Sequence, residues 1–403
     1  MEDLIKNLEK EIKSKFEEIE RIGEKNFIKV LSSFRKNGVV ESDFFDSTGY
    51  GFNDVGREKL ERVFAEIFDC EDSLVRSQIA SGSHAISIVF FSLLKPGDEL
   101  ITITGEPYDT IQRIIGTKKS PLSLKDLEIN YKELNIIEDD IDFRKIINDK
   151  TKMVFIQKSI GYGKRKKTLL NSEIKNYIKE IKNIKEDTII FVDNCYGEFV
   201  EENEPTSVGA DIIAGSLTKN PGGGIVPFGG YIAGKKNLIE KCSSLLSSPG
   251  IGKYGGAQIN FKRLAFLGLF LAPHFVKETL KGMVFASKLL SHYNFNVFPE
   301  WFEKRGDIIL GIEFKDKNNL IKFAQLIQKY SPVDSNAVLE PLKEDFYNYE
   351  VIMAGGTFTQ GSSIELSFDA PIKEPYIGYL QGGLMYEYIK YVIIKIVEEF
   401  KIV

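Results

Sequence analysis

A lysine set among small and hydroxyl residues is the first candidate for chemistry in this sequence. Lys219 follows an apolar run at 211–214 and the hydroxyl residues Ser216 and Thr218, and a glycine-rich stretch leads on to a second apolar run at 230–233. A lysine placed just past a strand can approach a bound molecule closely. If it is partly desolvated, its amine can lose its proton near neutral pH and act as a nucleophile. The alternative is an ordinary surface lysine beside a glycine-rich hairpin.

The segment SGSHA at 81–85 is a second candidate, because it lies where a strand gives way to an apolar helix. Helix N-termini carry unpaired N–H groups and the positive end of the helix dipole, which together favour phosphate. Gly82 lets the backbone come close to a ligand, and the hydroxyls of Ser81 and Ser83 can add donors. Simple N-capping by serine is the alternative, and the presence of Lys219 favours phosphate binding.

Two further polar residues follow strand-like runs. Asp193 ends TIIFVDN and is followed by Asn194, while Tyr108 lies in GEPYDT, just after the run ITIT. A turn that begins with Asp193 and Asn194, and a half-buried turn tyrosine, are the alternatives for these positions. The spacing between Asp193 and Lys219, with one strand between them, favours a shared site.

The elements that must position these residues indicate an α/β fold. The runs TKMVFIQ, TIIFVDN and ADIIAGS are too short and too uniformly apolar for amphipathic helices. Such runs, separated by helical stretches, predict a mostly parallel sheet with helices on both faces. These sheets bind ligands beyond the carboxyl ends of their strands, and the candidate residues above fall at those ends.

The two ends of the chain predict different structures. Residues 1–36 have helical spacing of apolar residues and predict an amphipathic helix packed on the body or on a neighbouring subunit. After residue 250 we expect a long helix broken near Pro273 and then a smaller α+β domain, with strands at DIILGIEF and SSIELSF and a final helix at 383–400. The predicted units are an N-terminal helix and arm (1–45), a large domain (46–250), and a linking helix with a small domain (251–403).

Composition excludes several classes of function. The net charge of -5 gives no electrostatic reason to expect binding to nucleic acid or to an anionic membrane. Three widely separated cysteines fit a reducing cytoplasm rather than a disulfide framework. No apolar run approaches transmembrane length, and the three histidines lack metal-ligand spacing, so we expect no metal site.

Several segments together resemble one known family. The sequence segments STGYGFNDVGR, SGSHA, EPYDT, VDNCYGEF, SLTKN and GTFTQGSSIELSFDAP resemble pyridoxal-phosphate enzymes of the aspartate-aminotransferase fold, fold type I. More narrowly they resemble the methionine gamma-lyase and cystathionine-lyase relatives often labelled aluminium-resistance proteins. The resemblance covers roughly residues 50–376. It implies a carbon–sulfur lyase that acts on sulfur-containing amino acids, with pyridoxal phosphate on Lys219 and shared active sites in a homodimer or homotetramer.

Other functions fit the same cofactor. An aminotransferase or another pyridoxal-phosphate enzyme could use this site, and so could a regulatory protein that only binds the cofactor. The presence of Lys219 argues against the last of these.

The resemblance also implies roles for individual residues. Asp193 would keep the pyridine nitrogen protonated, which makes the ring an electron sink. Tyr108 would stack on the ring and transfer a proton to the leaving group, and Lys219 would take the α-proton. The remaining cofactor contacts would be Ser81, Gly82, Ser83, His84, Gln157, Ser159, Asn194, Ser216 and Thr218.

Two departures from the family pattern affect the substrate and the phosphate. Relatives usually grip the substrate carboxylate with an arginine, but SFDAPIKEPY offers Lys373 at that place. Arg76, Arg113 and Arg165 are the alternative anchors. In related lyases an aromatic residue and an arginine cross from a neighbouring subunit to the phosphate. Tyr50 and Arg57 supply both types here, although Phe52 falls where the closest lyases place the arginine.

Overall fold

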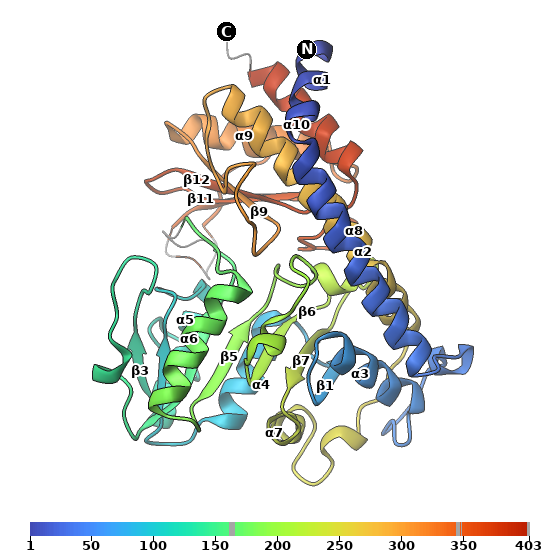
Figure 1. Cartoon of the computed structure of the whole chain (residues 1–403), viewed down its shortest axis with the longest axis vertical. Coiled ribbons are helices and arrows are strands. Elements are labelled where there is room, and N and C mark those ends of the chain that lie inside the picture. The colour runs from blue at the N-terminus through green and yellow to red at the C-terminus, as the bar shows by residue number, and fades with distance from the viewer. Residues whose placement is uncertain (161–165, 344–346, 348, 401–403) are drawn as a thin grey trace.

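The computed structural model describes residues 1–160, 166–343, 347 and 349–400. It contains two sheets, one above the other, and the helices α2 (Lys13–Lys36) and α8 (Lys262–His292) run along one side of both (Figure 1). The predicted fold class, a mostly parallel α/β sheet followed by a smaller C-terminal α+β unit, is confirmed.

The larger sheet has seven strands in the order β1-β7-β6-β5-β4-β2-β3. The five strands from β6 to β3 pair in parallel, and β7 is antiparallel to both of its neighbours. Strands β5, β6 and β7 are buried along their whole length, which explains why their sequences are uniformly apolar instead of alternating. The strands are β1 (Asp72–Arg76), β2 (Glu99–Thr102), β3 (Asn130–Glu133), β4 (Thr151–Gln157), β5 (Ile189–Asp193), β6 (Ile212–Ser216) and β7 (Gly230–Gly234).

Helices cover both faces of this sheet, and each face has its own apolar core. One core joins the sheet to α4 (Gly82–Leu93), α5 (Asp109–Ile115) and α7 (Lys236–Leu246). The other joins it to α3 (Val55–Ile67), α6 (Asn171–Ile184) and α8. The short 3-10 helices are η1 (Glu41–Phe44), η2 (Lys125–Leu127), η3 (Phe143–Lys145), η4 (Pro205–Val208), η5 (Asn220–Gly222) and η6 (Gly252–Tyr254).

Helix α8 is continuous through Pro273, so the predicted break at this residue is wrong. Proline removes one helical hydrogen bond and crowds the preceding turn. Here α8 packs against α2, α10 and η5, and this burial outweighs the local cost. The contact with η5 is very close, because a Cβ atom added at Gly268 would lie 2.3 Å from the carbonyl oxygen of Gly222.

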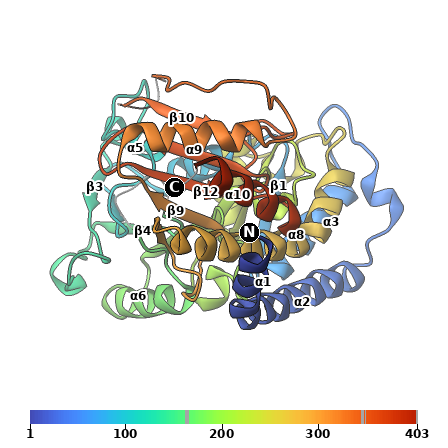
Figure 2. The ribbon, with the colours of Figure 1, turned by 90° about the horizontal axis from the view of Figure 1, so that it is seen from above.

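The smaller sheet is antiparallel throughout, in the order β10-β11-β12-β9-β8. Helices α9 (Lys317–Lys329) and α10 (Tyr386–Phe400) belong to this unit, and Figure 2 shows both from above. The predicted strand SSIELSF is only partly correct, since β11 begins at Ser367 and residues 362–366 form a loop. The strands are β8 (Asn296–Phe298), β9 (Ile309–Glu313), β10 (Val351–Ala354), β11 (Ser367–Pro371) and β12 (Ile377–Gln381).

The predicted N-terminal helix forms two helices, α1 (Glu2–Glu11) and α2, that pack on the body of the same chain. Phe16 meets the ring of Tyr386 edge to face at 5.2 Å, and Lys390 forms an ion pair with Glu9 at 2.5 Å. Across the described residues, no helix combines the length and the apolar character that crossing a membrane would require.

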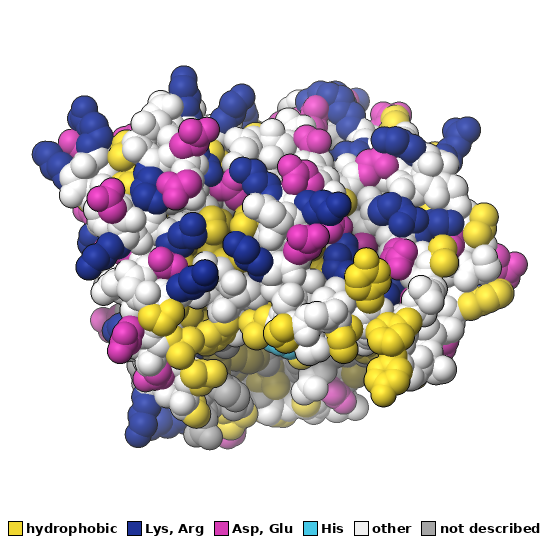
Figure 3. Space-filling view, turned by 90° about the horizontal axis from the view of Figure 1, so that it is seen from below, with side chains coloured by type: hydrophobic (Ala, Val, Ile, Leu, Met, Phe, Trp, Pro, Cys, Tyr) yellow, Lys and Arg dark blue, Asp and Glu magenta, His cyan; other side chains and the backbone are white. Residues whose placement is uncertain are grey.

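Hydrophobic side chains gather in a band on the face of the molecule seen from below (Figure 3). Among the exposed residues of the chain are several aromatic side chains that precede α3 or follow α7. Tyr50 is 77% exposed and Tyr254 is 70% exposed, and the rings of Tyr50 and Phe52 stack with centroids 5.4 Å apart. Exposed apolar side chains that gather in one patch often mark an interaction surface.

Candidate active site

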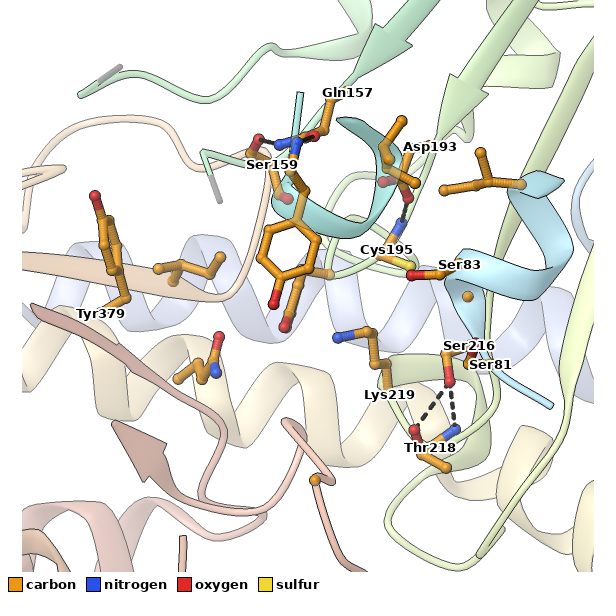
Figure 4. Close-up of a pocket in the computed structure, with 18 residues that line it drawn as sticks. Ser81, Ser83, Gln157, Ser159, Asp193, Cys195, Ser216, Thr218, Lys219 and Tyr379 are labelled. Carbon is orange, nitrogen blue, oxygen red and sulfur yellow. Dashed lines mark hydrogen bonds between the residues drawn. The ribbon is translucent and has the colours of Figure 1, made fainter. Parts of the chain in front are cut away.

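A cavity of about 250 Å³ lies at the carboxyl ends of β4, β5 and β6, between the two units (Figure 4). Nine of the predicted site residues line it, and Ser159 lines it as well. The smaller unit closes the other side with Ile309, Gly361, Tyr379 and Gln381. The predicted residues that line the cavity are Ser81, Gly82, Ser83, Tyr108, Gln157, Asp193, Ser216, Thr218 and Lys219.

Lys219 follows β6, and its amine points into the cavity. The Nζ atom lies 3.7 Å from the centre of the Tyr196 ring and donates a hydrogen bond to Ser363 Oγ at 3.2 Å. Burial lowers the pKa of this amine, but the neighbouring Tyr196, Cys195 and Asp193 more than offset burial, so the pKa lies above its ordinary value. These contacts favour the protonated amine, and the loss of its proton near neutral pH stays a prediction.

Hydroxyl groups and a helix N-terminus gather on one side of the cavity. The Oγ atom of Ser216 lies 2.9 Å from Thr218 Oγ1 and accepts from the Thr218 N–H at 3.2 Å. Ser81 caps α4 by accepting from the N–H of His84 at 3.1 Å. At Gly82 a Cβ atom would lie 3.1 Å from the Cys195 sulfur. These groups form a cup of hydroxyl and N–H donors suited to an anion.

His84 and Asn194 differ from their predicted roles as cofactor contacts, since neither lines the cavity. The Nδ1 atom of His84 accepts from the Ala80 N–H at 3.0 Å, and burial lowers its pKa, which keeps the ring neutral. Asn194 is fully buried and donates to Glu204 Oε2 at 2.9 Å. The His84 side chain thus bonds the turn before α4, and the Asn194 side chain bonds a buried glutamate.

Asp193 ends β5 with its carboxylate at the cavity wall. Its Oδ1 atom accepts from the Cys195 N–H at 3.1 Å, so the backbone of the following turn fixes the direction of the carboxylate. That turn contains Tyr196 at a φ of 71°, a left-handed conformation that side chains with a Cβ rarely adopt.

Tyr108 and Gln157 both line the cavity, and a hydrogen bond joins them. The phenol of Tyr108 lies 2.8 Å from the Tyr347 hydroxyl, and burial raises its pKa well above the ordinary value. The phenol therefore keeps its proton at neutral pH. Gln157 contacts the backbone of Tyr108 as well as the cavity.

A buried carboxyl group lies behind β6. Glu198 is completely buried, accepts from the Tyr231 hydroxyl at 2.8 Å, and would be 2.7 Å from a Cβ atom at Gly215. Burial raises its pKa to about 8, so the group is largely protonated at neutral pH. The sequence reasoning did not identify Glu198, although it lies in the segment VDNCYGEF.

The structure places Arg57 elsewhere than predicted. Its side chain is completely buried and donates to the carbonyl oxygens of Gly51 at 2.7 Å, Gly256 at 2.9 Å and Tyr254 at 3.0 Å. The guanidinium therefore joins two loops of its own chain and does not extend toward a neighbour. Tyr50 lies at the surface and outside the cavity of its own chain.

The candidate carboxylate anchors also lie away from the cavity. Lys373 is exposed, and its Nζ atom lies 4.0 Å from the centre of the Tyr349 ring. Arg76 is buried and bonded to Glu61 Oε1, while Arg113 donates to the Lys119 carbonyl oxygen at 2.9 Å. The other candidate, Arg165, lies outside the described residues. Within the described part of the chain, no group of three or more His, Cys, Asp and Glu side chains is arranged to hold a metal ion.

Sequence reasoning missed the half of the site around Tyr196 and the smaller unit. Tyr196 comes three residues after Asp193, so the turn after β5 gave a local signal. Gly361, Tyr379 and Gln381 come from a unit more than a hundred residues away, and only the fold brings them to the cavity.

A family profile, a curated relative and solved structures all match this chain over nearly its whole length. The sequence profile described as methionine gamma-lyase matches residues 1–401. The chain is 48% identical to the protein YnbB of Bacillus subtilis (strain 168), over 95% of this chain and 92% of that one. A solved structure from Clostridium novyi NT, described as a carbon-sulfur lyase involved in aluminum resistance, is 43% identical, covers 99% of this chain and 95% of its own, and has a TM-score of 0.94.

More distant structures share the fold alone. The cystathionine gamma-lyase from yeast is 18% identical, with coverage of 85% of this chain and 86% of that chain and a TM-score of 0.55. The profile match spans nearly the whole chain, and the identities above 40% extend over almost all of it. The chain belongs to the methionine gamma-lyase family.

Proposed function

We propose that this chain is a pyridoxal-phosphate-dependent carbon–sulfur lyase that acts on sulfur-containing amino acids. The observation that carries the proposal is the amine of Lys219, which points into a cavity with a hydroxyl cup on one side and Asp193 on another. Within the described residues no carboxylate lies at ion-pair distance from this amine, whose contacts are the Ser363 hydroxyl and the Tyr196 ring.

The residues present fit pyridoxal phosphate. Ser81, Ser216, Thr218 and the N-terminus of α4 would hold the phosphate. The room left at Gly82, where any side chain would press on Cys195, matches a close approach of an anion to the backbone. Asp193 would hold the protonated ring nitrogen. When bound, the cofactor supplies an electron-withdrawing ring that stabilises the charge left by a departing proton.

The chain's own residues would then handle two protons. The free, neutral amine of Lys219 takes the proton from the α-carbon of the substrate and becomes an ammonium. The carbon–sulfur bond breaks, and the sulfur leaves with the bonding electron pair. The phenol of Tyr108, whose raised pKa keeps it protonated, gives its proton to that sulfur, so a thiol is released.

The active unit in this proposal is a homodimer or homotetramer in which Tyr50 of one copy completes the site of another. The exposure of Tyr50 and Phe52, and their distance from the cavity of their own chain, support this arrangement. A second ring that seals the cavity from water would strengthen every electrostatic contact inside it.

The test combines one variant with one assay. Borohydride treatment should fix the cofactor permanently on Lys219, where peptide mass spectrometry would find it, and Lys219→Ala should carry none. Lys241→Ala, a change of an exposed lysine on α7, is the matched control. Purified protein is then incubated with cysteine, homocysteine, methionine and cystathionine while thiol and keto-acid release are followed.

Each result has a clear reading. Release of thiol and keto acid together supports the lyase. Keto acid that appears only when an acceptor keto acid is supplied would replace the lyase by an aminotransferase. A cofactor fixed at a lysine other than 219 would contradict the assignment of the site.

A further inference from the structure

Three groups converge on the amine of Lys219. Its Nζ atom donates to Ser363 Oγ at 3.2 Å and lies over the ring of Tyr196 at 3.7 Å, and the hydroxyls of Ser363 and Tyr196 are 3.1 Å apart. The serine hydroxyl therefore contacts both the amine and the phenol whose ring supports that amine. Hydrogen bonds to charged groups and cation–π contacts are both stronger in sites shielded from water.

Ser363 comes from the other unit of the molecule. It lies in the loop before β11, and its neighbour Ser362 donates to the carbonyl oxygen of Thr218 at 3.1 Å. Both serines are at most 5% exposed. Two adjacent hydroxyls thus bind two adjacent residues of the lysine turn, one through its backbone and one through its amine.

The loop that presents Ser363 is itself held firmly. The carboxylate of Glu365 accepts from the N–H of Phe358 at 2.7 Å and from the N–H of Thr359 at 3.0 Å, and Glu365 is 4% exposed. These bonds from charge to backbone close the loop between 358 and 365. The position of Ser363 is therefore supported by the buried carboxylate of Glu365, which ties down a loop whose tip, including Phe358, is exposed.

Tyr196 faces Ser363 from the opposite side in an unfavourable backbone conformation. Its φ of 71° is rare for a residue with a large side chain. Strained residues of this kind occur mostly where function requires a side chain at one place. Here the strain directs the ring under the amine of Lys219.

We propose that Ser363 is a positioning residue that holds the free amine of Lys219 over the Tyr196 ring whenever the amine is not bonded to the cofactor. This inference rests on the proposed function, and it identifies the Ser363 hydroxyl as the group that orients the Lys219 amine, which is the base. The serine oxygen only accepts a hydrogen bond from the amine. The α-proton itself moves to Nζ, and no proton passes to Ser363.

The first test uses the holoenzyme and three serine variants. Ser363→Ala should lower kcat about tenfold, the factor that corresponds to one charge-assisted hydrogen bond, with little change in KM. The Ser363 hydroxyl favours the ammonium form of Lys219. In Ser363→Ala the rise of kcat with pH, which follows deprotonation of this amine, should therefore have its midpoint at lower pH. Ser367→Ala removes a buried hydroxyl without a hydrogen-bond partner among the described residues and should change nothing. Ser362→Ala loosens the same loop but leaves the amine contact in place.

A second readout does not depend on turnover. Full-length protein freed of cofactor is treated with acetic anhydride across a pH series, and acylation of Lys219 is measured by peptide mass spectrometry. Only the neutral amine reacts, so Ser363→Ala should react at lower pH than wild type, while Ser362→Ala and Ser367→Ala should follow wild type. Because acylation needs no turnover, this measurement tests the role of Ser363 even if the protein has no lyase activity.

The outcomes that would overturn the inference are specific. Equal effects of Ser362→Ala and Ser363→Ala on the acylation midpoint would mean that Ser363 only anchors the loop. An unchanged pH midpoint of Lys219 acylation in Ser363→Ala would mean that the hydrogen bond between Ser363 and the amine does not affect the amine's protonation. If the alanine variant does not fold, Ser363→Cys, which is close in size and a weaker acceptor, is read by the same criteria.

Discussion

The side-chain oxygen of Gln157 accepts a hydrogen bond from the backbone N–H of Tyr108 at 2.9 Å. Gln157 ends β4 and Tyr108 precedes α5, so one bond fixes the entry of a helix to the end of a neighbouring strand. The predicted contact of Gln157 with a cofactor ring hydroxyl stays a prediction. Its contact with Tyr108 is an additional role, because it sets where the phenol lies.

Replacement of Gln157 by methionine should therefore disturb Tyr108. We expect the free energy of unfolding to fall by about 1–2 kcal/mol, since a partly buried N–H loses its acceptor, and kcat/KM to fall about tenfold. Gln157→Glu keeps an acceptor oxygen at the same place and should recover most of the stability. Urea unfolding and steady-state kinetics measure both quantities. Equal stability of the methionine and glutamate variants would contradict this role.

Asp193 should matter for the chemistry more than for the fold. Asp193→Asn keeps an oxygen that can accept from the Cys195 N–H but loses the negative charge opposite the proposed ring nitrogen. We expect kcat to fall about a hundredfold or more, comparable with the loss of one preorganised electrostatic group, at an unchanged melting temperature. A variant with full cofactor content and wild-type kcat would remove Asp193 from the mechanism.

Tyr50 is expected to act on a neighbouring copy. Lys219→Ala and Tyr50→Ala proteins, each with little activity, are mixed under conditions that allow subunits to exchange. A hybrid dimer would contain one site with both residues intact, and equal mixing makes half of the dimers hybrids, so activity should reappear toward about a quarter of wild type. Exchange verified by mass spectrometry without recovered activity would mean that Tyr50 does not act across the interface.

Arg57 should be needed for stability. Its guanidinium satisfies three buried carbonyl oxygens, so Arg57→Met should reduce the free energy of unfolding by about 2–4 kcal/mol. Arg62→Met, at an exposed position on the same helix, should change it by less than about 0.5 kcal/mol. Loss of cofactor affinity in Arg57→Met at undiminished stability would instead support a role of Arg57 at a phosphate.

Because burial raises the pKa of Glu198, we expect the free energy of unfolding to fall as pH rises. Its pKa of about 8 in the folded chain exceeds the ordinary glutamate pKa of 4.5, so between these values the folded state binds a proton that the unfolded state has lost. The contribution is fully present below pH 4.5 and is lost as pH rises through 8. Relative to Glu198→Gln, the wild type should lose about 3–5 kcal/mol over this window. Urea unfolding of both proteins at pH 5, 7 and 9 measures it, and parallel curves would contradict the assignment.

The strands and the large-unit half of the site were predictable because their signals are local. Asp193 and Lys219 directly follow apolar strands, and parallel strands bring such ends to one edge. Pro273 was misread because local backbone preference favoured a break, whereas the contacts of α8 with α2, α10, η5 and other elements outweigh it. Arg57 was misread because sequence spacing shows that a cation is present but not which carbonyl oxygens surround it. Ser363 lies in the quoted segment GTFTQGSSIELSFDAP, but its contact with Lys219 spans 144 residues, so only the fold shows that the two meet.

The close contact between Gly222 and Gly268 limits how the protein can be recombined. Helix α8 begins on the side of the larger sheet and packs against both the lysine turn and α10 of the smaller unit. A chimera that takes its C-terminal unit from a relative must therefore inherit α8 together with a matching turn after Lys219. A junction inside residues 262–292 would join two half-helices from different proteins, whose packing surfaces need not match. A shift of α8 would then displace Gly222 and, with it, the turn that carries Lys219.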